Sequence, residues 1–102
     1  MKTIWKYPLN LGFNGQRIRF RKGAKILKAD MQGDAICIWA LVDDAEKEEW
    51  REITIYGTGH RIPDELVDRL SFIDTVMDGA YVWHVFELLN ISKQEGEKQN
   101  VE

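Results

Sequence analysis

The chain has 102 residues, enough for one hydrophobic core and too few for two domains. Hydrophobic residues make up 44% of it and charged residues 30%, a balance typical of soluble globular proteins. The net charge of −3 argues against non-specific nucleic-acid binding, the single cysteine rules out an internal disulfide, and one cysteine with two histidines predicts no metal site.

Apolar and polar residues alternate with a period of two along most of the chain, which is the pattern of half-buried β-strands. Glycine, asparagine and proline interrupt this alternation at short intervals. Seven strands are therefore predicted, at residues 3–7, 16–21, 25–31, 35–42, 50–56, 70–77 and 80–88. Before the sixth, Pro63 and two following carboxylates favour the start of a short helix.

The turns between these strands indicate the fold class. Gly33 and the pair Asp78-Gly79 predict tight hairpins, and the acidic residues 43–49 are interpreted as an exposed loop or one helical turn. We predict an all-β domain over residues 1–90, a small antiparallel sandwich or barrel, followed by a disordered polar tail at 91–102. The alternative is an α+β fold in which residues 64–70 form a fuller helix.

Residues 35–42 are apolar at every position, which is typical of a central strand covered on both faces. A two-layer domain of this size covers only one face of most strands, so a helix or a second copy of the chain must cover the other. We predict a homodimer with Ile38 or Trp39 near the interface. Cys37 lies within this run and is predicted to be a buried, inert thiol.

Residues 57–63 are the most informative stretch for a ligand site. Gly57, Thr58 and Gly59 would let successive backbone N–H groups face outward as an anion-binding nest. His60 and Arg61 would add a donor and a fixed positive charge. The alternative is a structural turn in which His60 caps a neighbouring strand.

Alternation along residues 80–88 places Trp83 and His84 on opposite faces of the last strand. A histidine on an apolar face is most often a hydrogen-bonded core residue. The alternative is that His84 meets His60 in a polar pocket, where the pair would act as acid and base.

Arg17, Arg19 and Arg21 form a stripe on one face of the second strand. The simplest interpretation is a solvated face balanced by the acidic loop. If the stripe lies beside aromatic rings, it would instead bind a nucleotide or an acidic partner. The four tryptophans are assigned to the core by default, although tryptophan is also enriched at binding hot spots.

No phosphate-binding loop and no nucleophile elbow occurs, so no catalytic residue and no cofactor is predicted. No apolar stretch reaches the length of a membrane span and the N-terminus lacks a secretion signal, which predicts a cytoplasmic protein with no membrane contact.

Five sequence blocks together resemble a family of small uncharacterised proteins encoded by bacteriophages and prophages. They are residues 4–9 (IWKYPL), 23–27 (GAKIL), 39–43 (WALVD), 57–63 (GTGHRIP) and 82–87 (VWHVFE). The resemblance covers residues 1–88 and implies a phage accessory protein acting in a bacterial cytoplasm, without an established activity.

These observations lead to three functional expectations. The first is a non-enzymatic binding module that acts on a host protein or defence system through exposed aromatic anchors. The second is a binder that sequesters a small anionic, nucleotide-like ligand, using the loop at residues 57–61, the arginine stripe and Trp83. The third is a small enzyme using His60 and His84.

Overall fold

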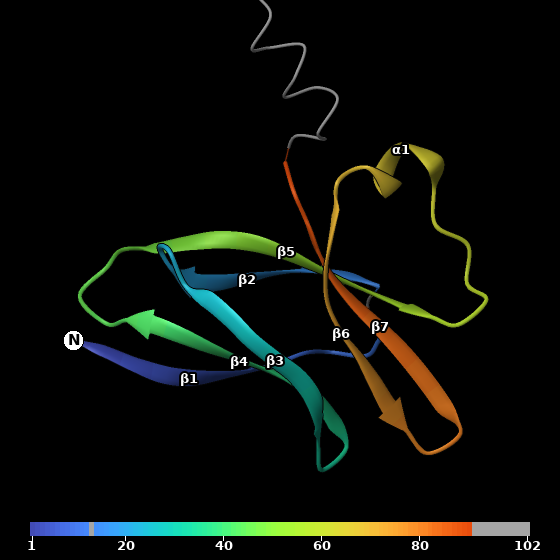
Figure 1. The fold of residues 1–102 in the computed structure, drawn as a ribbon, viewed down its shortest axis with the longest axis horizontal. Helices are drawn as coiled ribbons and strands as arrows, with labels where there is room; N and C mark the ends of the chain where they lie inside the picture. The colour runs from blue at the N-terminus through green and yellow to red at the C-terminus, as the bar shows by residue number, and fades with distance from the viewer. Residues whose placement is uncertain (13, 91–102) are drawn as a thin grey trace, which may run out of the picture.

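The computed structural model describes residues 1–12 and 14–90, which form a sandwich of two antiparallel sheets with one short helix (Figure 1). The elements are β1 (Lys2–Pro8), β2 (Gly15–Arg21), β3 (Lys25–Gln32), β4 (Ala35–Asp43), β5 (Glu48–Gly57), α1 (Asp64–Val67), β6 (Leu70–Asp78) and β7 (Tyr81–Leu88). The predicted all-β sandwich is confirmed. The α+β alternative is wrong, because α1 is a single turn.

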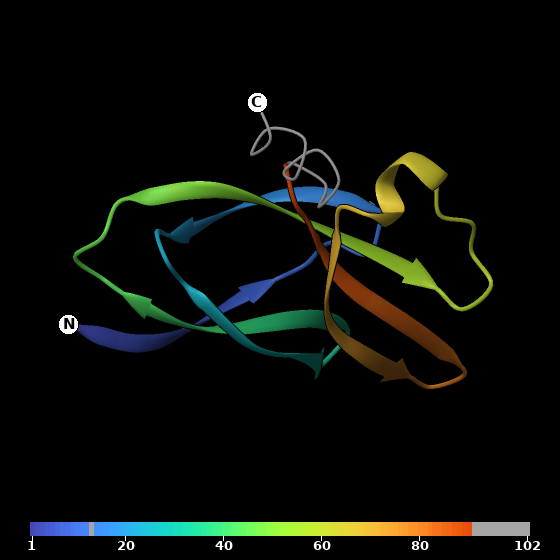
Figure 2. The same ribbon diagram turned by 45° about the horizontal axis from the view of Figure 1, so that its top comes forward.

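The two sheets combine strands that lie far apart in the sequence. The three-stranded sheet has the order β1-β4-β3, and the four-stranded sheet has the order β2-β5-β7-β6. In Figure 2, β2 and β5 run above β1 and β4, so the two layers are seen one over the other. Among the strands of the described residues, only the β3–β4 and β6–β7 pairs are hairpins of consecutive strands within one sheet.

The core lies between the sheets and follows the alternation expected from the sequence. In β4, Ile38 and Val42 point inward and are almost fully buried, whereas Trp39 and Leu41 point to the outer face. The expectation that Ile38 lies at a dimer interface is wrong, because its side chain is 0% exposed within the chain's own core. Cys37 is buried, as predicted.

The sheets also meet along one edge, between β3 and β6. A bulge in β6 between Phe72 and Asp74 shifts the register and presents the Asp74 carboxylate to β3. This carboxylate accepts a hydrogen bond from the backbone N–H of Ala29 at 3.2 Å and lies 3.7 Å from Lys28 Nζ. It therefore satisfies a donor on an edge strand that no neighbouring strand pairs.

Two local details differ from the sequence predictions. The strand β5 begins at Glu48, so the acidic segment is a shorter loop and contains no helical turn. Asp78 pairs with Tyr81, so the two-residue turn is Gly79-Ala80, with a φ of 58° at Gly79 that suits glycine. The predicted tail at residues 91–102 lies outside the described residues. Within the described ranges, no helix is long and apolar enough to cross a membrane.

Candidate functional site

The arginine stripe of β2 lies directly against exposed tryptophan. In the β2–β5 register Arg19 stands opposite Trp50, so the two side chains share the outer face of the four-stranded sheet. The guanidinium carbons of Arg17 and Arg19 lie 5.1 and 4.8 Å from the centre of the Trp50 ring. Trp50 nevertheless keeps 51% of its surface exposed. The arginine stripe therefore lies beside an aromatic ring, which was the requirement for the interpretation of the stripe as a binding surface.

Arg21 continues this surface across the edge of the sandwich to β1. Its guanidinium carbon lies 5.3 Å from the centre of the Trp5 ring, and Nη1 donates to the backbone oxygen of Glu46 at 2.9 Å. Trp5 is 37% exposed, because β1 is an edge strand and leaves this ring only partly covered. We call the set Trp5, Arg17, Arg19, Arg21 and Trp50 the tryptophan–arginine surface.

Carboxylates limit the positive charge of this surface. Glu52 stands opposite Arg17 and Glu48 stands opposite Arg21, both on the same face as the arginines. Stacking on a ring leaves the guanidinium N–H groups at the ring's rim free for carboxylate or phosphate, so a partner can be bound through both the ring and the charge. The surface therefore combines a modest positive charge with flat apolar area.

The loop after β5 does not form the predicted anion nest. The N–H of Gly57 donates to His60 Nδ1 at 3.1 Å, that of Thr58 to the Val82 oxygen at 3.3 Å, and that of His60 to the Gly57 oxygen at 3.0 Å. These donors are used inside the protein and are not free for an anion. The alternative interpretation is the correct one: the His60 side chain caps the end of β5.

Gly57 is required for this cap. A Cβ at Gly57 would lie 2.8 Å from the His60 ring, closer than real contacts allow. The glycine therefore lets the imidazole lie flat against the end of the strand. Arg61 lies beyond the cap and lines a separate open depression with Ile62 and Pro63.

The two histidines do not form a pair. His84 bridges two hydroxyl groups, with Thr58 Oγ1 2.8 Å from Nε2 and Thr75 Oγ1 3.1 Å from Nδ1. It stands opposite Tyr56 on the outer face of β7, whereas His60 packs against Trp83, whose side chain points to the other face of that strand. The arrangement gives no support to an acid–base pair.

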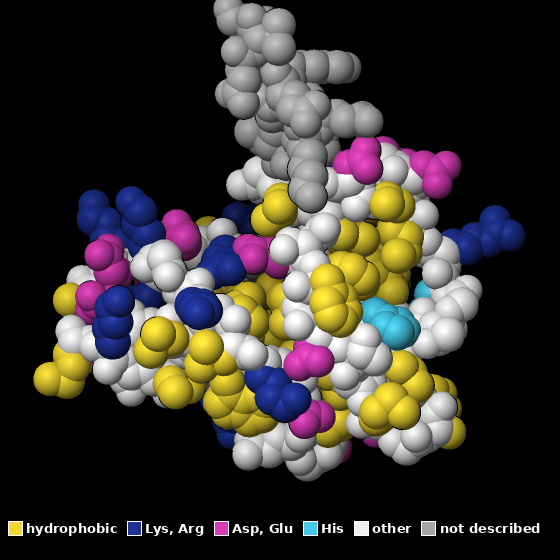
Figure 3. All heavy atoms as spheres, viewed as in Figure 1, with side chains coloured by type: hydrophobic (Ala, Val, Ile, Leu, Met, Phe, Trp, Pro, Cys, Tyr) yellow, Lys and Arg dark blue, Asp and Glu magenta, His cyan; other side chains and the backbone are white. Residues whose placement is uncertain are grey.

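Trp83 and His60 do line a common hollow of about 170 Å³ with Gly57, Thr58 and Tyr81. The His60 and Trp83 rings meet nearly at right angles, with centroids 6.3 Å apart, and the Tyr81 ring stacks beside Trp83 at 5.9 Å. Figure 3 shows the histidine side chains beside hydrophobic ones at this end of the molecule. Four of the predicted ligand residues thus come together, although with different chemistry from that expected.

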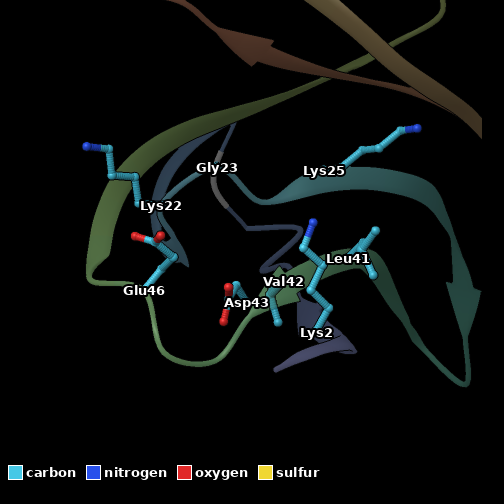
Figure 4. A pocket seen from close by; sticks show the side chains of 8 residues that line it. All are labelled: Lys2, Lys22, Gly23, Lys25, Leu41, Val42, Asp43 and Glu46. Carbon is cyan, nitrogen blue, oxygen red and sulfur yellow. The ribbon is translucent and has the colours of Figure 1, made fainter.

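A second cavity of about 330 Å³ lies at the opposite end of β5, between the β2–β3 turn and the β4–β5 loop (Figure 4). Lys2, Lys22 and Lys25 surround it, with Leu41 and Val42 at its base. Its carboxylates are Asp43 and Glu46. The N–H of Ala45 and the N-terminal ammonium bind Asp43 and hold the pKa of its carboxyl below the usual value, so this negative charge is already paired.

Sequence reasoning missed several of these residues. Trp5 and Trp50 were assigned to the core, although the charged neighbours of Trp50 at positions 49, 51 and 52 were a signal of exposure. Tyr81 lies two residues before Trp83 on the same strand, so the alternation places both side chains on one face and could have indicated Tyr81 as a further wall of the hollow. Lys22 and Lys25 flank one turn, but Lys2 comes from the distant start of β1, so the sequence gave no signal that the three lysines line one cavity. Among the described residues, no cluster of potential metal ligands occurs.

The model of the family described as "Domain of unknown function (DUF7352)" matches residues 1–95, so the chain belongs to that family. No curated protein and no solved structure shows a significant match to the chain.

Proposed function

We propose that this member of the DUF7352 family is a non-enzymatic binding module that binds an acidic protein partner through the tryptophan–arginine surface. The observation that carries the proposal is the half-exposed Trp50 ring with Arg17 and Arg19 over it. Tryptophan and arginine are the residues most enriched at the energetic centres of protein interfaces.

The geometry favours a protein over a small ligand at this surface. Trp50 and the arginines lie on the outer face of a sheet, which offers area rather than an enclosed volume. The stacked guanidinium groups are held in place before binding, so less side-chain entropy is lost when they engage a carboxylate. Glu48 and Glu52 at the margins disfavour partners with uniformly acidic surfaces and so add specificity.

The resemblance to small phage-encoded proteins supports a protein of the bacterial host cytoplasm as this partner. Accessory proteins of this kind commonly act by occupying a host protein or a defence system. The same resemblance gives no support to an enzymatic activity, and the sequence contains no phosphate-binding loop and no nucleophile elbow.

The test is a quantitative co-purification from bacterial lysate with wild-type protein and matched surface variants. Proteins retained by wild type are expected to be lost with Trp50→Ala and Arg19→Glu, because a hot-spot truncation weakens binding by about 30-fold or more. Arg19→Lys should retain only part of the binding, since lysine keeps the charge and loses the planar stacking group.

The control is Met77→Ala, which removes an equally exposed apolar side chain on β6 and should retain the same proteins as wild type. Each variant is first shown to unfold at the wild-type temperature. If the retained proteins are the same for wild type, Trp50→Ala and Arg19→Glu, this surface is not the binding site.

A second candidate function rests on the lysine-lined cavity of Figure 4. Lys2 at the start of β1 and Lys22 and Lys25 at the β2–β3 turn line it, and their positive charge supports the sequestration of a small anionic ligand such as a nucleotide. Calorimetry against cyclic and linear nucleotides tests this function. Heats of binding are expected with wild type and should disappear with Lys22→Glu and Lys25→Glu; baseline heats across the panel would reject the candidate.

A further inference from the structure

The hollow at the end of β7 is a separate feature from the tryptophan–arginine surface. Seven residues of extended strand separate Trp50 from Gly57, which corresponds to roughly 23 Å along β5. The hollow is walled by the rings of His60, Tyr81 and Trp83, and the small residues Gly57 and Ala80 also line it.

Its walls are formed mainly by the faces and edges of aromatic rings. The His60 and Trp83 planes meet at 70°, which makes a corner, and Tyr81 extends the Trp83 wall at an interplanar angle of 20°. Aromatic faces carry a negative quadrupole and attract cations within about 6 Å of the ring centre. A group seated in the corner is within this range of more than one ring.

The polar groups around the hollow also favour a cation over an anion. His60 Nδ1 accepts the Gly57 N–H, so this ring nitrogen is already engaged in the cap of β5. The Asp78 carboxylate lies 3.5 Å from Trp83 Nε1 and places a negative charge at the margin of the indole. The backbone N–H groups of Gly57, Thr58 and His60 donate within the protein, to His60 Nδ1, the Val82 oxygen and the Gly57 oxygen.

The size of the hollow limits what it can hold. At about 170 Å³ it is smaller than the ~300–1,000 Å³ typical of pockets for drug-sized ligands. It fits a compact group of a few heavy atoms or the end of one side chain. A compact cation with an apolar surface satisfies both the volume and the aromatic walls.

We propose that the hollow formed by His60, Tyr81 and Trp83 binds a quaternary or methylated ammonium group. The shared chemistry has two sources, a free small molecule of the choline type or a methylated lysine side chain of a protein. Trp83 and the nearly parallel Tyr81 ring form one wall of the corner, His60 forms the other, and Asp78 provides the counter-charge.

Titration of the full chain with three probes, followed by tryptophan fluorescence and by NMR, tests this proposal. The probes are choline, a short peptide containing trimethyllysine, and 3,3-dimethylbutanol, the neutral isostere of choline. We expect saturable binding of a cationic probe in the millimolar range and no binding of the neutral isostere at the same concentrations. Binding of choline but not of the peptide would indicate a free small molecule as the ligand. Tighter binding of the peptide than of choline would indicate a methylated protein.

Variants separate the cation site from a merely apolar hollow. Tyr81 is 64% exposed, so Tyr81→Ala keeps the fold and should weaken binding about three-fold, whereas Tyr81→Phe retains it. Asp78→Asn should weaken binding by a similar factor. Met77→Ala, on the same hairpin and 65% exposed, is the control with unchanged binding.

Two results would overturn the proposal. Equal binding of choline and its neutral isostere would show that charge plays no part, and the absence of saturable binding of both cationic probes would show that the hollow is not a cation site. Neither result bears on Trp50, so the proposed protein interface stands or falls separately.

Discussion

Arg51 points into the sandwich and is held there by three neighbours. Its guanidinium group forms two hydrogen bonds of 2.7 Å with the Glu87 carboxylate and a third with the Ala24 oxygen, and it lies over the Phe20 ring. Both charged side chains are largely buried. The hydrogen bond to Glu87 is the main reason that the pKa of Arg51 is raised, so arginine stays charged at this position.

Glu87→Gln should therefore be strongly destabilising. The change leaves a buried guanidinium without its counter-charge, and we expect a loss of about 2–3 kcal/mol in the free energy of unfolding, measured by urea denaturation at pH 7. The double variant Arg51→Met with Glu87→Leu is the control and should recover most of the loss, because it removes both charges. If Glu87→Gln alone is as stable as wild type, water solvates the Arg51 guanidinium in place of the carboxylate, and the prediction is wrong.

Individual residues show how far sequence reasoning reached. The alternation of Arg17, Arg19 and Arg21 with Ile18 and Phe20 is confirmed by their exposure and burial, because a period of two depends only on the strand itself. The default assignment of Trp50 to the core was wrong. Whether a tryptophan on a strand is covered depends on which strand lies beside it, and that information is not local.

At the level of elements, the seven strands and the short helix were predictable, since turn residues and periodicity mark them. The exact bounds were less so: Glu48 belongs to β5 only because it pairs with Arg21 of β2. The bulge in β6 was not predicted either, because it is defined by the register with β7.

The contact of Asp74 with the β3 edge gives a prediction at this scale. Asp74→Ala leaves the Ala29 N–H without its acceptor, so we expect a loss of about 1 kcal/mol in the free energy of unfolding and faster aggregation through the β3 edge. Thermal unfolding and light scattering measure the two effects. Asp74→Asn keeps an acceptor oxygen and should behave more like wild type; if both variants match wild type, the edge is protected by other means.

At the scale of the whole molecule, the outer face of the three-stranded sheet is the surface on which the homodimer prediction depends. Ile4, Trp39 and Leu41 form an apolar centre there, and lysines surround it on β1 and β3. The lysines on this face are Lys2, Lys6, Lys25 and Lys28. The homodimer proposed from the sequence would place this face against its own copy and bring the lysines of both copies together.

Self-association through this face should therefore increase with salt, which screens the repulsion between lysines. We expect a dimer in sedimentation at high micromolar concentration and ~0.5 M salt, and a folded monomer for Trp39→Glu. Ile38→Glu should instead unfold the chain, since its side chain lies in the core. A wild-type chain that is monomeric at every salt concentration would reject the dimer.

The strand order also sets the time course of folding. The β3–β4 and β6–β7 hairpins are local and can close within ~1–10 μs, whereas pairing of Lys2 with Asp43 or Gly15 with Thr54 must first close long loops. During synthesis, the three-stranded sheet can assemble once Asp43 has left the ribosome. The four-stranded sheet cannot, because β5 stands between β2 and β7, and β7 is translated last of these strands. Until Leu88 emerges, the edge of β5 that pairs with β7 has no partner. The nascent chain therefore most needs a chaperone during this interval.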